Sequence, residues 1–468
     1  MNQVNQMSRC ARTVQQRMYL VAALVVLLWP ARMAWAEGQI FVPNYNGDRV
    51  TVYGRKAAGD VAPSTTILTG SFSAPHNVAI HHGAGELFVS NNLAYTVSVY
   101  DLATGVLKRT ISSPSIIRPT GLAIDELNGE IYVANDYGNS VAVFDALAAG
   151  DATPKRVIQS AYYLSGPSGI ALDLANDELV VASQGFNAIL TFGRRASGDV
   201  SPKRIIWGGA TLLNLPQGVS IDVMNNEILV ANSAYQTPNG GAILVFPRTA
   251  GSFPEGPWDP APLRQIAGSN SGICNPMSVA LDRITNELIV ANSNAGAGTC
   301  AQSVTTYARA TNGNVAPTRT LSGALTELLS PESAAITSGS SVNLKAMALK
   351  SSVTVGAGLT AAIGYTITMT ANGGPVLNAS LADQLPGGLS WSLGGTHASA
   401  CTVSLSNVLT CNFGNIAKGD ARQIQVGATA TVANCPGIVN QAFAAFDDGT
   451  AYAATARSSA ATISIKCK

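Results

Sequence analysis

Asparagine recurs at one position of a short apolar phrase, and a ring of amide side chains could hold an ion, water molecules or a sugar. The phrase reads IFVPN, LFVSN, IYVAN, ILVAN and LIVAN, and a sixth copy, LVVAS, ends in Ser183. If every copy ends beside one opening, we expect its last side chain to bind a ligand there. These predicted ligand-binding residues are Asn44, Asn91, Asn135, Asn232 and Asn292. The alternative is local, because an asparagine side chain also stabilises the turn after a strand.

A second set of candidates follows a proline that starts another recurring phrase, as in PHNVAI and PESAAIT. This set contains one carboxylate, Glu332, and one imidazole, His76, which we expect to lie side by side on the rim of the same opening. Such a pair could bind a ligand or perform acid–base chemistry with a divalent ion. One carboxylate among amides suits Ca²⁺ poorly, since that ion prefers several hard oxygen ligands. We predict ligand binding by His76 and Glu332, with no metal site and no cofactor.

Two further sets of side chains recur in the turns. Aromatic residues follow the asparagine phrase and could form a binding platform, because tyrosine combines a large contact area with a polar tip; they are Tyr45, Tyr95, Tyr137, Phe186 and Tyr235. Aspartates end phrases such as GLAID and GIALD, and we interpret them as turn formers at the opposite face; they are Asp125, Asp173, Asp222 and Asp282.

The elements that position these residues form a repeat. Successive copies of the asparagine phrase are 44 to 60 residues apart, a period typical of a propeller blade. We expect four strands in each unit: the PSGIALD type, the EIYVAN type, the SVAVF type and the KRVI type. The apolar runs in the first two strands favour burial on both faces between neighbouring blades.

The two ends of the repeat region complement each other. The region opens with QIFVPN, which lacks a first strand, and it ends with PESAAIT, which lacks the other three. Pairing these segments closes a ring and removes the free edges of the sheets. The predicted fold class is therefore all-β, with a six-bladed β-propeller over residues 37–337 followed by an immunoglobulin-like β-sandwich.

The phrases EIYVANDYGNSVAVFD and PSGIALD resemble the Tyr-Val-Thr-Asn and NHL-type propeller repeats of exported bacterial proteins, over about residues 38–337. The resemblance implies the fold and leaves the activity open, because propellers host many unrelated activities. Gluconolactonase-type propellers place metal-binding carboxylates and amides around this opening. Here Glu332 is the one acidic residue among those that follow the proline of each PSGIALD-type phrase.

The chain changes character after a predicted linker at 338–343. Residues 344–468 contain about seven short alternating segments, which favour an immunoglobulin-like β-sandwich. The phrases YTITMTANGG, LADQLPGGLSW, NIAKGD and IVNQA resemble a repeat of bacterial surface proteins known as domain of unknown function eleven. The resemblance implies an extracellular module that acts as a spacer or an adhesive element.

The first 36 residues read as a secretory signal peptide, with arginines, an apolar run and AWA before Glu37. An uncleaved membrane anchor is the alternative, but the run is short for a bilayer span. Six cysteines follow, and an even number in an exported protein predicts disulfides. Adjacent loops favour Cys274–Cys300, a hairpin favours Cys401–Cys411, and Cys435–Cys467 is the pair left over.

Charge and the absence of known motifs limit the classes of function that the sequence predicts. With 28 basic and 27 acidic residues, a net charge of +1 and no basic stripe, the sequence does not predict a nucleic-acid partner. It contains no GxSxG, HExxH, P-loop, dinucleotide or EF-hand motif. We expect an exported bacterial binding or scaffold protein, secreted, periplasmic or on the cell surface, with no membrane span after signal removal. Its ligand would be an unknown glycan, peptide or protein, bound at the mouth of the propeller channel. Two alternatives stay open: a lactonase-like or lyase-like metal-dependent hydrolase at the same mouth, and a purely structural component of the cell envelope.

Overall fold

The computed structural model describes residues 38–68, 70–234, 241–293, 301–337, 341–372, 374–447 and 453–468. The predicted signal peptide, residues 1–36, lies outside this part of the chain. Helices here are single 3-10 turns: η2 (Tyr45–Gly47), η3 (Gln184–Phe186), η4 (Gly209–Thr211), η5 (Ala324–Thr326), η6 (Ala398–Ala400) and η7 (Val432–Asn434). Among the described residues we find no helix whose length and apolarity would let it span a membrane.

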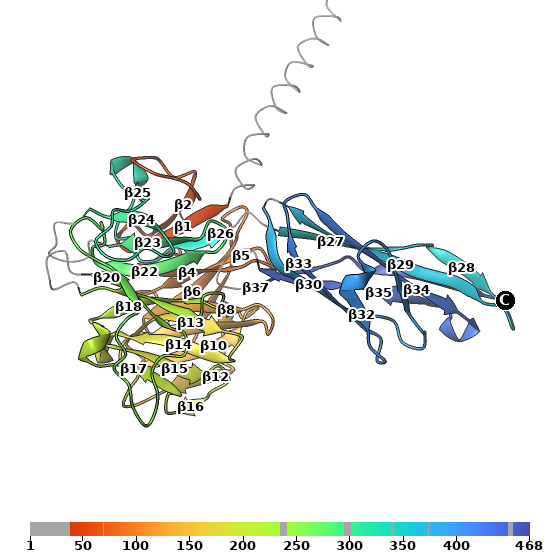
Figure 1. Ribbon diagram of the computed structural model, residues 1–468, viewed down its shortest axis with the longest axis horizontal. Coiled ribbons are helices and arrows are strands. Elements are labelled where there is room, and N and C mark those ends of the chain that lie inside the picture. The colour runs from red at the N-terminus through yellow and green to blue at the C-terminus, as the bar shows by residue number, and fades with distance from the viewer. Residues whose placement is uncertain are drawn as a thin grey trace, which may run out of the picture.

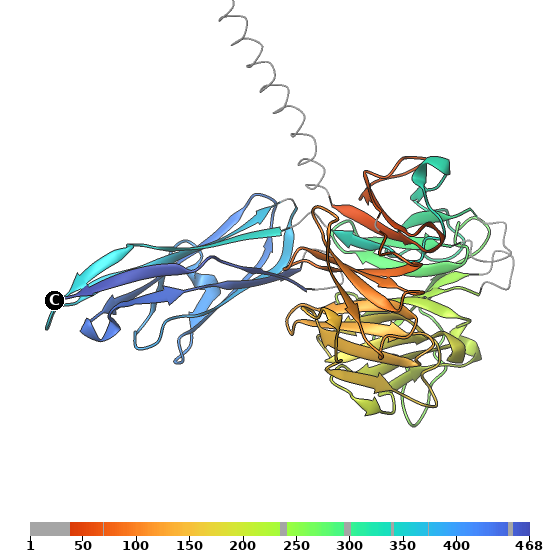
Figure 2. The ribbon, with the colours of Figure 1, turned by 180° about the vertical axis from the view of Figure 1, so that it is seen from behind.

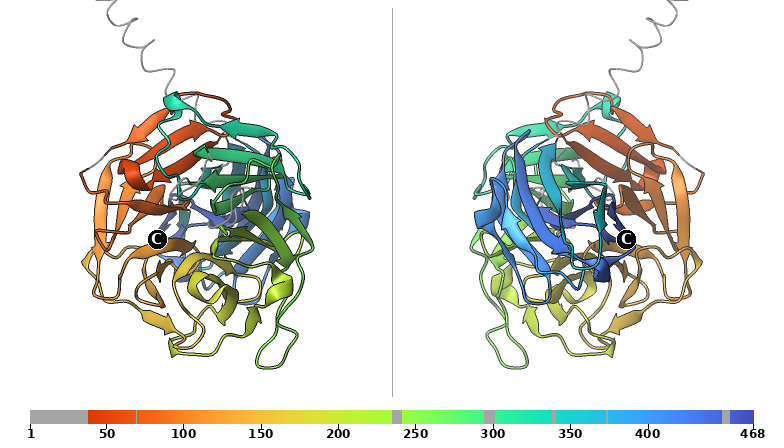
Figure 3. Two further views of the ribbon diagram at one scale, coloured as in Figure 1. Left: turned by 90° about the vertical axis from the view of Figure 1, so that its left-hand side faces the viewer. Right: turned by 90° about the vertical axis from the view of Figure 1, so that its right-hand side faces the viewer.

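Six antiparallel sheets surround a common axis and form a β-propeller (Figures 1 and 3). We number the blades from β1. Their strands are, for blade 1, β26 (Ala335–Thr337), β1 (Gln39–Asn44), β2 (Arg49–Gly54) and β3 (Thr65–Ile67); for blade 2, β4 (Pro75–His81), β5 (Glu86–Asn91), β6 (Thr96–Asp101) and β7 (Leu107–Ser112); for blade 3, β8 (Pro119–Asp125), β9 (Glu130–Asn135), β10 (Ser140–Asp145) and β12 (Arg156–Gln159); for blade 4, β13 (Pro167–Asp173), β14 (Glu178–Ser183), β15 (Ala188–Gly193) and β17 (Arg204–Ile206); for blade 5, β18 (Pro216–Asp222), β19 (Glu227–Asn232), β20 (Ala242–Pro247) and β21 (Arg264–Ile266); and for blade 6, β22 (Pro276–Asp282), β23 (Glu287–Asn292), β24 (Ser303–Ala308) and β25 (Arg319–Leu321).

The ring closes as the two incomplete ends of the repeat predict. Strand β26 pairs antiparallel with β1, with Gln39 opposite Thr337 and Phe41 opposite Ala335. An isolated bridge between Asn44 and Pro331 continues this pairing toward the channel mouth. Blade 1 is therefore built from both ends of the propeller region, so unfolding one end must open the ring.

Small pairings also link several blades to the one before. Strand β11 (Gly150–Asp151), from a turn of blade 3, pairs parallel with β7 of blade 2. Strand β16 (Gly198–Asp199), from blade 4, pairs in the same way with β12 of blade 3. The core lies between blades, where apolar faces of neighbouring sheets meet; one such cluster joins Phe88 and Val99 of blade 2 to Ile131 and Phe144 of blade 3.

Glycine sets the width of the central channel. A Cβ atom at Gly121, Gly169 or Gly218 would collide with the backbone of the next blade's first strand. Neighbouring blades from 3 to 6 therefore approach one another backbone to backbone. The equivalent positions in blades 2, 6 and 1 are Asn77, Ser278 and Ser333, so polar side chains line the other half of the channel.

The last part of the chain is a β-sandwich of three sheets, seen at the left of Figure 2. The first sheet contains β27 (Ser341–Ala348), β29 (Ala361–Asn372), β34 (Ala421–Ala430) and β31 (Ser392–Gly394); the second contains β28 (Ser352–Val355), β38 (Ala461–Cys467) and β35 (Gly437–Asn440); the third contains β32 (Cys401–Val403), β33 (Val408–Ile416), β30 (Val376–Gln384), β36 (Phe443–Asp447) and β37 (Ala453–Arg457). The sequence predicts about seven strands here, which is too few, because short edge strands carry weak alternation. Strand β27 begins at Ser341, inside the segment predicted as a linker.

Two predicted disulfides are confirmed. Cys401 and Cys411 face each other across the β32–β33 hairpin with a Cα–Cα distance of 4.0 Å. Cys435 pairs with Cys467 at a Cα–Cα distance of 6.5 Å. The third prediction, Cys274–Cys300, involves a cysteine at position 300 that lies outside the described residues.

Candidate functional site at the channel mouth

The recurring asparagines are buried in the blades, with exposed fractions between 0% and 4%. Asn135 is typical: its Nδ2 donates to the hydroxyl of Ser140 at 3.3 Å, and its Oδ1 accepts from the backbone N–H of Ile117 at 3.0 Å. The same acceptance from the preceding loop recurs at four other copies, Asn44, Ser183, Asn232 and Asn292. These side chains tie the end of the second strand to the loop that enters the blade.

These internal contacts weigh against an asparagine ring that binds a ligand, and the ligand-binding role of these residues stays a prediction. An amide whose oxygen and nitrogen are both engaged inside a blade has little capacity left for a ligand. At Asn91 the Nδ2 also donates internally, to Thr96 and Ser98, while its buried Oδ1 has no partner among the described residues. The local interpretation fits the four asparagines whose nitrogens donate across the hairpin after the strand: Asn44, Asn91, Asn135 and Asn292. Asn232 instead donates to Leu212 in the preceding loop.

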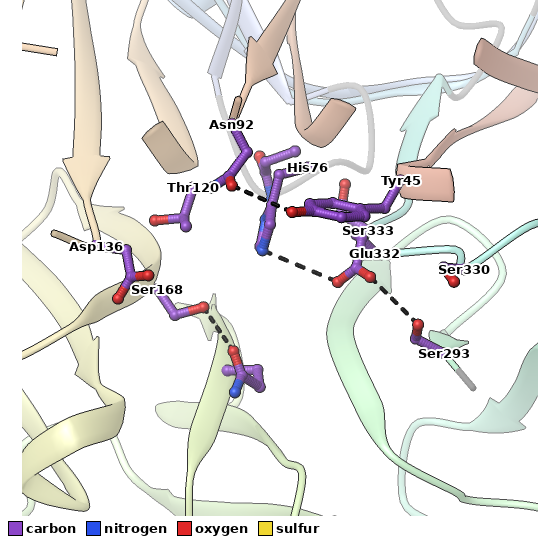
Figure 4. A network of polar contacts seen from close by, with 12 residues as sticks. Tyr45, His76, Asn92, Thr120, Asp136, Ser168, Ser293, Ser330, Glu332 and Ser333 are labelled. Carbon is purple, nitrogen blue, oxygen red and sulfur yellow. Dashed lines mark hydrogen bonds and ion pairs between the residues drawn. The ribbon is translucent and has the colours of Figure 1, made fainter. Parts of the chain in front are cut away.

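Polar side chains at the mouth come from the residue that directly follows each recurring asparagine or Ser183. Figure 4 shows four of these residues at the mouth: Tyr45, Asn92, Asp136 and Ser293. Gln184 and Ser233 hold the same position in blades 4 and 5. Gln184 donates to Asp136 at 3.1 Å and accepts from Gln217 at 2.9 Å. Ser168 donates to the side-chain oxygen of Gln217 at 2.8 Å. A network of polar contacts thus crosses from blade to blade (Figure 4).

Ring closure brings His76 and Glu332 together, as expected from the sequence. Their side chains point toward each other in Figure 4, with Nε2 of His76 3.9 Å from Oε2 of Glu332. The other carboxyl oxygen, Oε1, accepts a hydrogen bond from the hydroxyl of Ser293 at 3.2 Å. His76 is 16% exposed and Glu332 is 4% exposed, so both groups are largely withdrawn from water.

Burial sets the protonation of this pair. It raises the pKa of Glu332 to about 8, against the smaller opposing effect of the Ser293 hydrogen bond. It lowers the pKa of His76 to about 4, and the positive charge of Arg118 acts in the same direction. Both side chains are therefore neutral near pH 7, and their 3.9 Å contact is not an ion pair there.

Two buried atoms of the pair have no partner among the described residues: Nδ1 of His76 and Oε2 of Glu332. A buried polar atom without a hydrogen bond costs about 1–3 kcal/mol. Directly below the pair, the residues that follow it, Asn77 and Ser333, line a channel cavity of about 110 Å³. The pair thus stands at the entrance of a small cavity, with hydrogen-bonding capacity unused.

A metal centre finds little support in the described residues, where no group of three His, Cys, Asp or Glu side chains could hold an ion. Asp136 is another acid near the mouth. Burial raises its pKa, and the Gln184 hydrogen bond and the charge of Arg118 oppose that effect.

The aspartates at the opposite face do more than form turns. Asp125 accepts from the backbone and side chain of Asn128 within its own hairpin, as predicted, at 3.1 and 2.8 Å. It also forms a buried ion pair with Arg194 of the next blade. Equivalent pairs join three more interfaces: Asp173–Arg248, Asp222–Arg309 and Asp282–Arg55. These residues hold the ring together, far from the mouth.

Solved structures resemble this chain in fold at low sequence identity. A nidogen–laminin complex has 15% identity and a TM-score of 0.46, covering 64% of this chain and 98% of that chain. A protein of Bacteroides fragilis, provisionally assigned as a 6-phosphogluconolactonase, has 12% identity and a TM-score of 0.41. The match covers 83% of this chain and 98% of that protein. The β-propeller domain of Cps50 from Myceliophteria thermophila has 11% identity and a TM-score of 0.39, covering 62% and 87%. No family model and no curated protein matches the chain. At these identities and TM-scores the similarity carries no information about activity.

Proposed function

We propose that this chain is an exported bacterial binding protein whose propeller takes a hydroxyl-rich ligand at the channel mouth. The observation that carries the proposal is the pair of buried, unpartnered atoms, Nδ1 of His76 and Oε2 of Glu332, at the entrance of the channel. Hydroxyl groups both donate and accept, so they can satisfy a neutral carboxyl group and a neutral imidazole together.

The chemistry of the pair favours an uncharged contact. Near pH 7 a protonated Glu332 can donate one hydrogen bond, and a neutral His76 offers one donor and one acceptor. The contact should change little while both groups stay neutral. It should weaken as the pH rises through about 8, because Glu332 then ionises and loses its proton donor.

Export is supported by the signal pattern in residues 1–36 and by the disulfides Cys401–Cys411 and Cys435–Cys467, because disulfides persist in oxidising compartments. The resemblance to Tyr-Val-Thr-Asn and NHL-type repeats and to domain of unknown function eleven points the same way. We place the mature protein outside the cytoplasm, in the periplasm, on the cell surface or in the medium.

A hydrolase at the same mouth is the second candidate, and one observation favours it. The pKa of Glu332, raised to about 8 beside a neutral imidazole, is that of a group able to exchange protons near neutral pH. A lactonase-like or lyase-like activity would use this carboxyl group as acid or base.

The test is a screen of the mature protein against glycans, peptides and lactones, with binding and turnover measured together. The informative variants are Glu332→Gln and His76→Asn, and Glu255→Gln is the matched control because Glu255 is exposed. The proposal expects a ligand whose affinity falls in both mouth variants and is unchanged in the control. Turnover of a lactone that requires Glu332 would support the hydrolase instead. Affinity that ignores all three changes would refute a site at this mouth.

A further inference from the structure

We propose, building on the binding function above, that the ligand is an acidic saccharide such as a uronic-acid oligomer. In this arrangement Arg118 binds the sugar carboxylate while the sugar hydroxyls meet His76 and Glu332. The inference follows from the position of Arg118, from how its guanidinium group is held, and from the groups beside it.

The backbone places Arg118 on the rim. It is the residue before the proline of β8, with a left-handed φ of 51°, and its carbonyl accepts from the N–H of Asp136 at 3.1 Å. Left-handed backbone recurs before the first strand of each blade, so the turn is a fixed part of the repeat; the residues are Ala74, Arg118, Gly166, Leu215, Asn275 and Ser330. Arg118 is the charged member of that set.

The guanidinium group is fixed on one side and open on the other. Its Nε donates to Oδ1 of Asn92 at 3.2 Å, and its central carbon lies 4.0 Å from the ring centroid of Tyr137. No hydrogen bond or ion pair to its two terminal NH₂ groups occurs among the described residues. A planar fork held in this way is suited to a carboxylate, which it binds through two parallel hydrogen bonds.

Arg118 and the His76–Glu332 pair belong to one surface. The same oxygen of Asn92 accepts from the hydroxyl of Tyr45 at 3.4 Å, and the Tyr45 ring meets the His76 ring edge-on at 6.3 Å. The charge of Arg118 also reaches His76, whose pKa it lowers. One ligand can therefore contact the guanidinium group and the neutral pair together.

The surroundings favour a saccharide over other carboxylates. Tyr137 is 67% exposed and Tyr45 borders the pair, so aromatic rings are available to pack against the C–H faces of a sugar. Asp136, an acid near Arg118, forms no ion pair with it in the described part of the chain and accepts from Gln184, although the charge of Arg118 opposes the rise that burial causes in the pKa of Asp136.

The test compares galacturonic-acid oligomers with their methyl esters, which keep the sugar and remove the charge. By calorimetry we expect the acid to bind about tenfold or more tightly than the ester, with a difference that shrinks at high salt. Arg118→Gln should abolish the difference, and Arg118→Lys should keep part of it because the charge remains but the fork is lost. Arg195→Gln is the matched control, since Arg195 is exposed and its contact, Asp177, lies in the β13–β14 hairpin at the face opposite the mouth.

The outcomes separate this inference from the function on which it rests. Equal binding of acid and ester refutes the inference and leaves a neutral-ligand site in place. If a peptide C-terminus binds through Arg118 and the sugar acid does not bind, the assignment of the ligand as a saccharide is refuted. Failure of every saccharide and peptide to bind refutes the proposed function itself. Tyr137→Ala keeps the charge but removes the stacking, so a smaller loss than in Arg118→Gln is expected if the variants are folded, as judged by circular dichroism.

Discussion

Replacing Glu332 with Gln tests the electrostatics of the channel mouth, because glutamine keeps the shape of the side chain and cannot ionise. Burial raises the pKa of Glu332 from 4.5 to about 8. At about 1.4 kcal/mol per pKa unit, the shift corresponds to about 5 kcal/mol of unfolding free energy. That amount is what ionisation of Glu332 inside the folded protein would cost.

The sign follows from the direction of the shift. A raised folded pKa means that the unfolded chain releases its proton first as the pH rises. The contribution of Glu332 to stability is therefore fully present below 4.5 and is lost as the pH rises through about 8. Glu332→Gln has no such loss, so its stability relative to wild type should increase by up to about 5 kcal/mol between about pH 4 and pH 9.

Urea denaturation of the mature protein, followed by near-ultraviolet circular dichroism at several pH values, measures this difference. His76 acts with the opposite sign, because a pKa lowered to about 4 makes stability fall on acidification below 6.5. That effect is common to wild type and variant and cancels in the comparison. Glu255→Gln should track wild type at every pH. A Glu332→Gln difference that stays constant with pH would refute the argued burial of an uncharged carboxyl group.

Three structural predictions accompany it. Gly169→Ala should destabilise the propeller by about 2 kcal/mol or more, because the new Cβ collides with the backbone of the next blade. The control Gly193→Ala, which has open space around the new Cβ, should leave the stability unchanged in thermal melts. Arg194→Met should lower the free energy of unfolding by about 3–5 kcal/mol, because buried Asp125 loses its ion-pair partner. Adding Asp125→Asn to the same chain should restore part of that loss. A chain that ends at Ser330 lacks β26 and should melt at a lower temperature than one that ends at 337; equal melting temperatures would contradict ring closure by that strand.

The fold follows largely from local patterns in the sequence. Strand type, turn position and repeat period are each encoded within a few residues, and two incomplete ends allow one simple closure. Phrases such as EIYVAN become strands buried on both faces, as their unbroken apolar runs predict. The hairpin cysteines 401 and 411 are similarly close in sequence and could be paired from spacing alone.

The identity of the mouth residues depended on contacts between segments far apart in the chain. The recurring Asn135 and the residue after it, Asp136, differ by one position, yet the first is buried in its blade and the second joins the polar network of the mouth. Repetition marks Asn135 because five of the six blades share the same loop anchor, whereas residues at a binding surface need not repeat. Arg118 carries no repeated signal at all, and its proposed role follows from its turn, from Asn92 on the neighbouring blade and from the aromatic ring beneath it. A repeat thus reports what each blade requires for folding, while a binding site is defined by how the blades differ where they meet.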